Sequence, residues 1–321
     1  MRLRWQSKPR FDASRPASSR LSARSSRQNL TPSTSATQMW ETPRDESHFA
    51  SRVLFHPCFH SANIHSYENE MTCLICSACP TIKSHLIPRV MATEVQVGKA
   101  HAFVLPSRPG YLESQSGLFW DSSILCGHCD SSIGRFEEST AQAFVSLRNA
   151  GVGVQELKVV SAEQAPDVTL RFYAALLWKY AVARRELGKI DLGPYKSELQ
   201  RVAFEGAPIP NFFDAVLMRL RLSPDDAGVF AYRAPKPDRK EGLNMYRVMV
   251  GGVLAFVKVD QRPWANPLFT GIALSNATTT RALVVAAQNF EEFKVSQALA
   301  HGDSRVSAFL DKQDAYAAQN A

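Results

Sequence analysis

The chain has 321 residues, which is enough for one large domain or for two domains of ordinary size with their own cores. Its hydrophobic share of 45% and its charged share of 21% are typical of a globular protein in water. No apolar run approaches the roughly 18 residues that a membrane-spanning helix needs. These properties exclude an integral membrane protein, and we expect a cytoplasmic one.

The net charge of +7 belongs to the N-terminal end of the chain. Residues 1–44 hold nine basic and two acidic side chains, so residues 45–321 carry 28 of each kind and are neutral overall. A neutral domain exerts no general attraction on phosphate groups. A nucleic-acid site in this part of the chain must therefore be a local patch.

Residues 1–70 are expected to form a disordered, Arg/Ser-rich N-terminal extension. The first 50 residues show no sustained apolar periodicity, so they cannot bury enough surface to offset the entropy of ordering. Their basic, acid-poor composition also suits an organelle transit peptide. Met71 stands directly before the first cysteine pair, and translation starting there would omit the extension. We favour a start at Met71 over a targeting role.

Three helices are expected in the middle of the chain. The first begins near Ser131, with acidic residues in its first turn, and stops at Gly151. The second begins at Pro166, stops at Gly188 and carries a wide apolar stripe, as a helix packed on a core requires. The third is expected within residues 193–206.

The last third of the chain gives mixed signals. Residues 211–222 suit either a helix or a strand, whereas the apolar run 245–259 predicts strands that turn through Gly251 and Gly252. A further strand is expected at 228–237. Residues 280–299 are expected to form a C-terminal helix.

Five of the six cysteines lie between residues 73 and 129. Cys73, Cys76 and Cys79 follow at steps of three, and Cys126 and Cys129 form a second Cys-x-x-Cys pair. A two-residue spacer lets both sulfurs of a turn face one ion, so two such pairs supply the four ligands of tetrahedral zinc. The alternatives are a disulfide or unlinked thiols. We favour structural zinc because nothing in the sequence resembles a secretion signal.

These motifs resemble the HNH, or His-Me finger, endonucleases with a zinc-stabilised core, and especially a group of bacterial HNH-like proteins. The motifs that carry the resemblance are "CLIC" at 73–76, "SHLIPR" at 84–89, "SQSGLFWDSSILCGHCD" at 114–130 and "DLGPYKSEL" at 191–199. The resemblance covers roughly residues 71–205, pairs Cys73 with Cys76 and leaves Cys79 as an extra thiol. It implies an α+β fold in which an HNH-like ββα-metal module (71–150) precedes a mixed helical and antiparallel-strand domain (151–321).

In HNH enzymes a histidine at the end of the first strand acts as general base on water, and a divalent metal stabilises the leaving oxyanion of the phosphodiester. The resemblance implies that His85 is the base and that Asp130 or Glu137 helps to hold Mg²⁺ or Mn²⁺. Arg89, beside the proposed base, is the candidate for contact with a nucleic-acid phosphate. Two features depart from the family: Ser84 replaces the usual metal-binding acid, and the following helix carries no histidine over residues 132–149.

Other functions remain open. His85 can be structural, either as a zinc ligand in place of one thiolate or as a residue that hydrogen-bonds the loop. On "WKYAVARRELGK", Lys179, Arg184 and Arg185 can form a basic patch with Trp178 and Tyr180, although such helices usually have a solvated face opposite a packed one. The candidate functions are a nuclease acting on nucleic acid, with DNA favoured over RNA, a zinc-stabilised nucleic-acid- or protein-binding module without catalysis, and a structural scaffold.

Overall fold

The computed structural model describes most of the chain beyond residue 70. The predicted N-terminal extension and Cys79 lie outside the described residues. The described ranges are 71–78, 80–93, 102–104, 113–115, 120–222 and 233–302, with Ser304 and Ala308.

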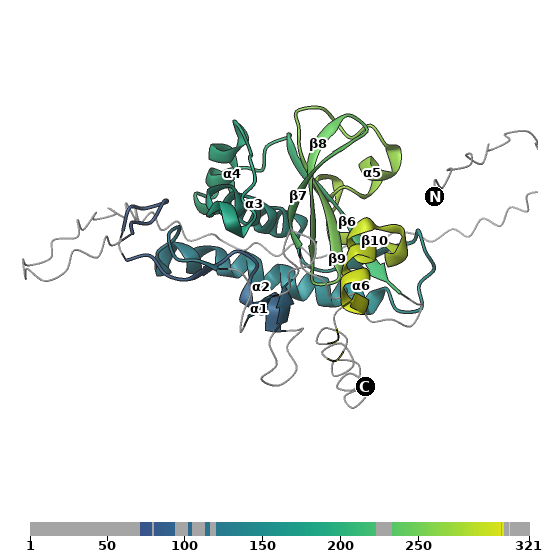
Figure 1. Ribbon diagram of the computed structural model, residues 1–321. Coiled ribbons are helices and arrows are strands. Elements are labelled where there is room, and N and C mark those ends of the chain that lie inside the picture. The colour runs from purple at the N-terminus through teal and green to yellow at the C-terminus, as the bar shows by residue number, and fades with distance from the viewer. Residues whose placement is uncertain are drawn as a thin grey trace, which may run out of the picture. The chain divides into compact units, whose positions relative to one another are not determined.

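A six-stranded mixed sheet forms the middle layer of the described residues (Figure 1). Strands β10 and β6 are parallel neighbours, and all other neighbours are antiparallel. The edge strand β7 contains Pro235 and Pro237. An edge strand tolerates proline because it pairs with a neighbour on one side only, so the missing N–H can face the unpaired side. The strand order is β5 (Val159–Ala162), β10 (Thr280–Ala286), β6 (Phe213–Arg221), β9 (Val253–Val259), β8 (Leu243–Val250) and β7 (Arg233–Lys240).

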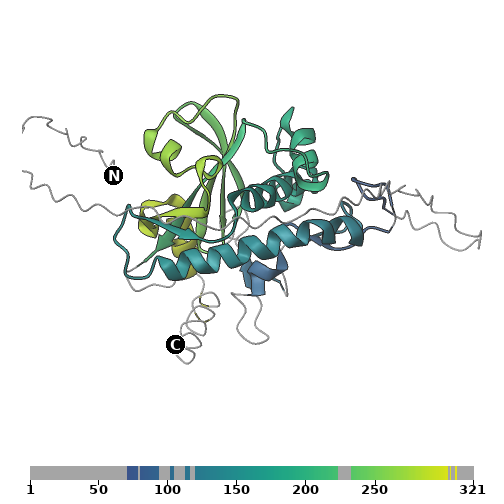
Figure 2. The same cartoon turned by 180° about the vertical axis from the view of Figure 1, so that it is seen from behind.

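The side chains of the sheet alternate between two apolar layers, as strand geometry requires. In β6, Leu217 belongs to the layer formed with three helices, whereas Met218 belongs to the opposite layer formed with two others. Because both faces are covered, β6 and β9 are buried along their whole length. The first layer contains α2 (Gly127–Ala150), α3 (Pro166–Val182) and α4 (Tyr195–Phe204), and the second contains α5 (Pro267–Ile272) and α6 (Glu291–Gly302) (Figures 1 and 2).

The three helices expected in the middle of the chain are confirmed. Helix α2 begins at Gly127, earlier than expected, because Cys126 already serves as its extended N-cap residue. The segment after α3 continues as a short 3-10 helix, Arg185–Leu187, and Gly188 ends it with a φ of 88°, a backbone conformation that glycine adopts without strain.

Helix α3 is buried all round rather than along one stripe. Phe172 and Leu176, which lie off the expected stripe, are as fully buried as Leu170 and Tyr173. Helices α2 and α4 pack against α3 in addition to the sheet, so every residue of α3 after the exposed Asp167 of its first turn is buried or partly buried. Helix α3 is therefore the central helix of its layer.

The predicted C-terminal helix over residues 280–299 is wrong in its first half. Residues Thr280–Ala286 form β10, which lies inside the sheet between β5 and β6. A strand buried on both faces presents a continuous apolar run, which helical periodicity cannot exclude. A helix, α6, begins only at Glu291. The predicted hairpin through Gly251 and Gly252 is confirmed by the pairing of β8 with β9, and residues 213–221 form a strand, β6.

The N-terminal part of the described chain has short elements around α2. Strand β1 pairs with β4 in a two-stranded sheet, and β2 pairs with β3 in another. Helix α1 packs against α2. The bounds are β1 (Ser84–His85), α1 (Arg89–Thr93), β2 (Ala102–Val104), β3 (Glu113–Gln115) and β4 (Trp120–Asp121).

Helix α2 ends in close contact with the sheet. The Nη1 atom of the buried Arg148 donates a 2.7 Å hydrogen bond to the carbonyl of Gly251 in the β8–β9 turn. A Cβ atom at Gly151, which follows α2, would lie 2.6 Å from Nε of the buried Arg219, so only glycine fits this approach. These contacts fix the C-terminal end of α2 on the sheet.

One apolar cluster runs from Cys73 to Val284, and the described residues belong to one compact unit. The predicted domain boundary near residue 150 falls at the end of α2, which packs against α3 and β5 on the other side of that boundary. Within the described residues no helix has the length and apolarity needed to cross a membrane.

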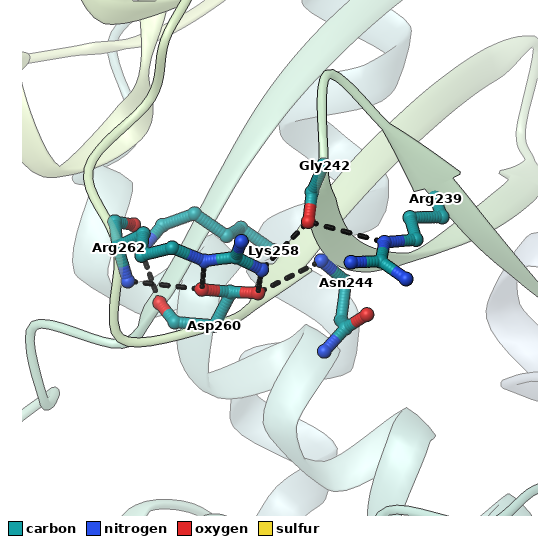
Figure 3. Close-up of polar contacts among 6 residues, drawn as sticks. All are labelled: Arg239, Gly242, Asn244, Lys258, Asp260 and Arg262. Atoms are coloured by element: carbon teal, nitrogen blue, oxygen red, sulfur yellow. Dashed lines mark hydrogen bonds and ion pairs between the residues drawn. The ribbon is translucent and has the colours of Figure 1, made fainter.

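A polar network ties the end of β9 to the turn between β7 and β8 (Figure 3). Asp260 accepts hydrogen bonds from Arg262 at 2.6 and 2.8 Å and from the backbone N–H of Asn244 at 3.0 Å. The Nζ atom of Lys258, itself buried, donates to the backbone carbonyls of Asp260 and Arg262. Arg262 also donates to the carbonyl of Gly242. Hydrogen bonds from Arg262 hold the pKa of Asp260 well below its ordinary value.

We expect Asp260→Asn to lower the free energy of unfolding at pH 7 by about 2 kcal/mol, because the Arg262 guanidinium loses its charged partner. Because the pKa of Asp260 is lower in the folded than in the unfolded state, its carboxylate stabilises the fold fully at pH values above the unfolded-state pKa. This stabilisation is lost as the pH falls toward the folded-state pKa. The difference from the parent should therefore shrink below about pH 4. Urea unfolding of the parent and of Asp260→Asn at pH 7 and pH 3 measures this difference in the free energy of unfolding.

The matched control is Asp167→Asn, since Asp167 is an exposed carboxylate on α3. It should change the free energy of unfolding by less than about 0.5 kcal/mol at either pH. Equal effects of the two substitutions at pH 7 would contradict a stabilising role for the Asp260 network.

Candidate functional site

Four cysteine thiols gather at the start of α2. Cys73 and Cys76 lie on one turn, Cys126 is the N-cap residue of α2 and Cys129 lies in its first turn. Their sulfur atoms all lie within 4.8 Å of one another, and Sγ of Cys76 is 3.6 Å from Sγ of Cys126. All four are free thiols rather than disulfides. The spacing therefore brings together the four residues that the sequence predicts as metal ligands.

Backbone hydrogen bonds hold the two cysteine turns face to face. The Cys73 N–H donates to the carbonyl of Ala78 at 2.8 Å, which closes the first turn. The Leu74 N–H donates to the carbonyl of Ile124 at 2.9 Å, and that bond joins the first turn to the segment that leads into α2. The Ile75 N–H points at Sγ of Cys73, 3.5 Å away, as backbone amides do around metal-binding thiolates.

The cluster is electrostatically prepared for a cation. Burial acts to raise the pKa of Cys73, but hydrogen bonds from backbone groups at Cys76, Cys126 and Ile75 outweigh it and lower that pKa to about 7. Burial and the neighbouring thiols raise the pKa of Cys129 far above its ordinary value. One thiol thus ionises readily while another resists, and a bound cation would allow all four to ionise.

The donor set fits a tetrahedral soft metal such as zinc. Zinc–sulfur bonds of about 2.3 Å place the sulfurs of a tetrahedral site about 3.8 Å apart. The 3.6 Å separation of two sulfurs and the 4.8 Å limit on all of them are consistent with that figure. The four-cysteine cluster can therefore hold a metal ion.

We expect the full chain to bind one metal ion of this kind per molecule and Cys76→Ser to weaken its binding on the order of 100-fold or more, because one of four thiolate ligands is lost. Metal content after dialysis against graded chelator, measured by mass spectrometry, tests this. Cys79→Ser is the matched control and should leave the metal content unchanged. If both variants kept the metal content of the parent, the cluster would not be the metal site.

A second group of polar side chains lies on the strand pair beside the cluster. In the β1–β4 pair, Ser84 stands opposite Asp121 and His85 opposite Trp120. Ser84 is buried, and its hydroxyl donates a 2.6 Å hydrogen bond to Oδ1 of Asp130 on α2. The predicted site residues on β1 and α2 are therefore brought together.

Lys179 of α3 lies beneath this group with its side chain only 1% exposed. Its Nζ atom donates at 2.7 Å to the backbone carbonyl of His85 and at 2.7 Å to Oε1 of Glu137. The aromatic and basic patch considered as one possibility for this helix does not form, since Lys179, Trp178 and Tyr180 are all buried. Lys179 neutralises the Glu137 carboxylate, which weakens Glu137 as a ligand for a divalent ion.

The electrostatic surroundings keep the His85 imidazole neutral. Burial lowers its pKa below the ordinary value of 6.5, and the Lys179 ammonium lowers it further. The carboxylates of Asp130 and Glu137 act in the opposite direction, and Arg89 adds to the lowering. At neutral pH the imidazole can therefore accept a proton. Arg89 is an exposed residue at the start of α1, four residues after His85.

Sequence reasoning missed two residues that position this site, Lys179 as a buried charge and Asp121. The buried carboxylate of Asp121 accepts from the backbone N–H of Arg184 at 2.9 Å and from the hydroxyl of Ser123 at 2.6 Å. Burial acts to raise the pKa of Asp121, but these hydrogen bonds and the Arg184 charge lower it. The available signal was a lone lysine inside the apolar run "YAALLWKYAVA", because such a charge is buried only with a partner.

No family model matches the chain, and neither a curated protein nor a solved structure matches it. Any assignment of function therefore depends on the chemistry of the residues around the thiol cluster and His85.

We expect Lys179→Met to lower the free energy of unfolding by about 3–5 kcal/mol, because Glu137 and the His85 carbonyl lose a buried partner. Chemical unfolding followed by circular dichroism measures the change. The double variant Lys179→Met/Glu137→Leu should recover part of the loss, since it removes the stranded carboxylate as well.

The control substitution is Lys189→Met, at an exposed lysine a short distance along the chain. It should shift the free energy of unfolding by less than about 0.5 kcal/mol. A Lys179→Met variant as stable as this control would mean that the buried ion pair contributes nothing.

Proposed function

We propose that this chain is an HNH-like, metal-dependent endonuclease that cleaves phosphodiester bonds in nucleic acid, with zinc held by the four cysteines. The observation that carries the proposal is the position of His85. It is half-buried and neutral at the end of a strand, beside carboxylates of the helix that follows the second cysteine pair. A general base that activates water for attack on a phosphodiester needs this combination of a free lone pair and a nearby site for a divalent ion.

The order of the elements supports the proposal. Strands β1 and β4 form an antiparallel pair and lead into α2, which is the strand–strand–helix order of the ββα-metal module. The thiol cluster lies at the N-terminal end of α2, so a bound zinc would fix the helix against the strand pair. The histidine of the motif "SHLIPR" is the last residue of β1.

Each residue has a defined role in this proposal. His85 takes a proton from the attacking water, and Asp130 helps to hold Mg²⁺ or Mn²⁺ near the leaving oxygen. Glu137 takes part less directly, because its carboxylate is already paired with Lys179 at 2.7 Å. Arg89, exposed at the start of α1 and four residues after His85, would contact a substrate phosphate. DNA is favoured over RNA as the substrate.

The second candidate is a zinc-stabilised binding module without catalysis. The specific observation in its favour is the bond between Ser84 and Asp130, in which the serine hydroxyl occupies a carboxylate oxygen that a divalent ion would use. Serine also stands where HNH enzymes commonly have a metal-binding acid, so fewer charged ligands are present for Mg²⁺.

We expect the full chain to nick supercoiled plasmid in Mg²⁺ or Mn²⁺, and a folded His85→Ala variant to lose at least about 100-fold in rate, because the general base is removed. Agarose gel electrophoresis of timed samples measures the nicked fraction. His128→Ala is the matched control, since His128 is an exposed histidine near the cysteine cluster, and it should retain the parent rate.

Two other outcomes would contradict the nuclease. A zinc-loaded parent that cleaves nothing would leave the binding module as the function. Equal cleavage by the parent and His85→Ala would mean that the activity does not come from this site.

A further inference from the structure

A hollow of about 800 Å³ lies between the C-terminal end of α3 and the start of α4. It is lined by the segment that connects the two helices, which contains the 3-10 helix Arg185–Leu187 and ends at Lys196 in the first turn of α4. Figure 1 shows α3 and α4 side by side, and the connecting segment runs between them. The hollow therefore lies outside the thiol cluster and the His85 group.

Basic side chains dominate the lining of this hollow. Arg184, Arg185, Lys189 and Lys196 contribute four cations, against the single carboxylate of Asp191. Arg184 forms ion pairs with acidic neighbours. Within the described residues no ion pair is formed by Arg185, Lys189 or Lys196, and all three side chains are exposed. Three cations that neutralise no carboxylate of the fold are available for an external anion.

The backbone adds to the positive character of the hollow. Helix α4 has ten residues and no side chain caps its N-terminal end. The N–H groups of Tyr195 and Lys196 donate to the carbonyls of Leu192 and Gly193, so the backbone contributes the helix dipole there. Lys196 lies in this first turn, where the helix dipole disfavours a cation. The one acidic residue of that turn, Glu198, is paired with Arg201. Lys196 therefore lowers the stability of α4 slightly, and binding of an anionic ligand would compensate for this cost.

The hollow is joined directly to the strand that faces β1. Arg184, on its wall, donates its backbone N–H to the carboxylate of Asp121 at 2.9 Å, and its Nε atom lies 3.5 Å from the same carboxylate. Asp121 stands opposite Ser84 in the β1–β4 pair, directly before His85. Arg184 therefore links the wall of the hollow to β4, the strand that pairs with β1.

We propose that this hollow binds the phosphate backbone of single-stranded nucleic acid and positions it beside His85. The inference deepens the proposed function and rests on it for the direction in which the strand runs. The contacts are to phosphate and carry no base specificity, because the lining offers cations and no aromatic side chain, and the nearby Trp178 and Tyr180 are buried.

The test measures binding of a fluorescent 20-nucleotide single-stranded DNA by anisotropy, with no divalent ion added. We expect Arg185→Glu/Lys189→Glu/Lys196→Glu to bind on the order of 100-fold more weakly than the parent at low salt. The milder triple change of the same residues to Gln should reduce the slope of log K against log salt by about 2, since each lost phosphate contact on a single strand removes about 0.7.

The matched control reverses three exposed charges elsewhere, Lys158→Glu/Arg239→Glu/Lys294→Glu, which alters the net charge equally. It should bind within about threefold of the parent. Equal loss in the two triple variants, with both folded by circular dichroism, would overturn the proposal by showing that only net charge matters. Displacement of the DNA by micromolar pyrophosphate would overturn it in favour of a small phosphate ligand.

This binding test is separate from the nicking test. Specific loss of binding in the triple variants, combined with no cleavage by the parent, would support the hollow and reject the nuclease. Cleavage that depends on His85, combined with unchanged binding in the triple variants, would support the nuclease and reject the hollow.

Discussion

The buried ammonium group of Lys179 is the contact on which the candidate site depends. An isolated ammonium of this kind costs several kcal/mol to bury, so it must be matched by partners on more than one element. Its two partners are the backbone carbonyl of His85 on β1 and the carboxylate of Glu137 on α2. Because α3 itself lies in the middle of the helical layer, the lysine fixes the strand and the helix relative to the core. It also supplies part of the field that keeps the imidazole neutral.

Helix α2 carries this arrangement from the thiol cluster to the sheet. Its first turn contains Cys129, its middle presents Glu137 to Lys179, and its last turn places Arg148 on the β8–β9 turn. A helix of 24 residues is about 36 Å long, so the two ends serve different neighbours. A metal ion held by the cysteines at one end would stabilise the same helix that sheet packing stabilises at the other, and α2 fixes the positions of the polar side chains between the two ends.

Local signals in the sequence predicted most helices and the four clustered cysteines. These signals are the helix stops at Gly151 and Gly188 and the Cys-x-x-Cys spacing. Each acts over a few residues and does not depend on contacts with distant parts of the chain. The parts that could not be predicted depend on distant partners. The apolar run of β10 suits a helix as well as a strand, and it forms a strand only because β5 and β6 flank it in the sheet. Lys179 meets His85 across 94 residues, and no local pattern specifies that contact.

The sheet has a topology with a consequence for synthesis on the ribosome. The thiol cluster and α2 use only residues 73–150, so they can form early, while the chain is still emerging. Strand β5 cannot pair until its partner β10, roughly 120 residues further along the chain, has been synthesised. Until then β6 also lacks a neighbour and leaves an apolar edge uncovered. A fragment that lacks β10 would therefore expose unpaired, aggregation-prone strand edges, even though every residue around His85 is present.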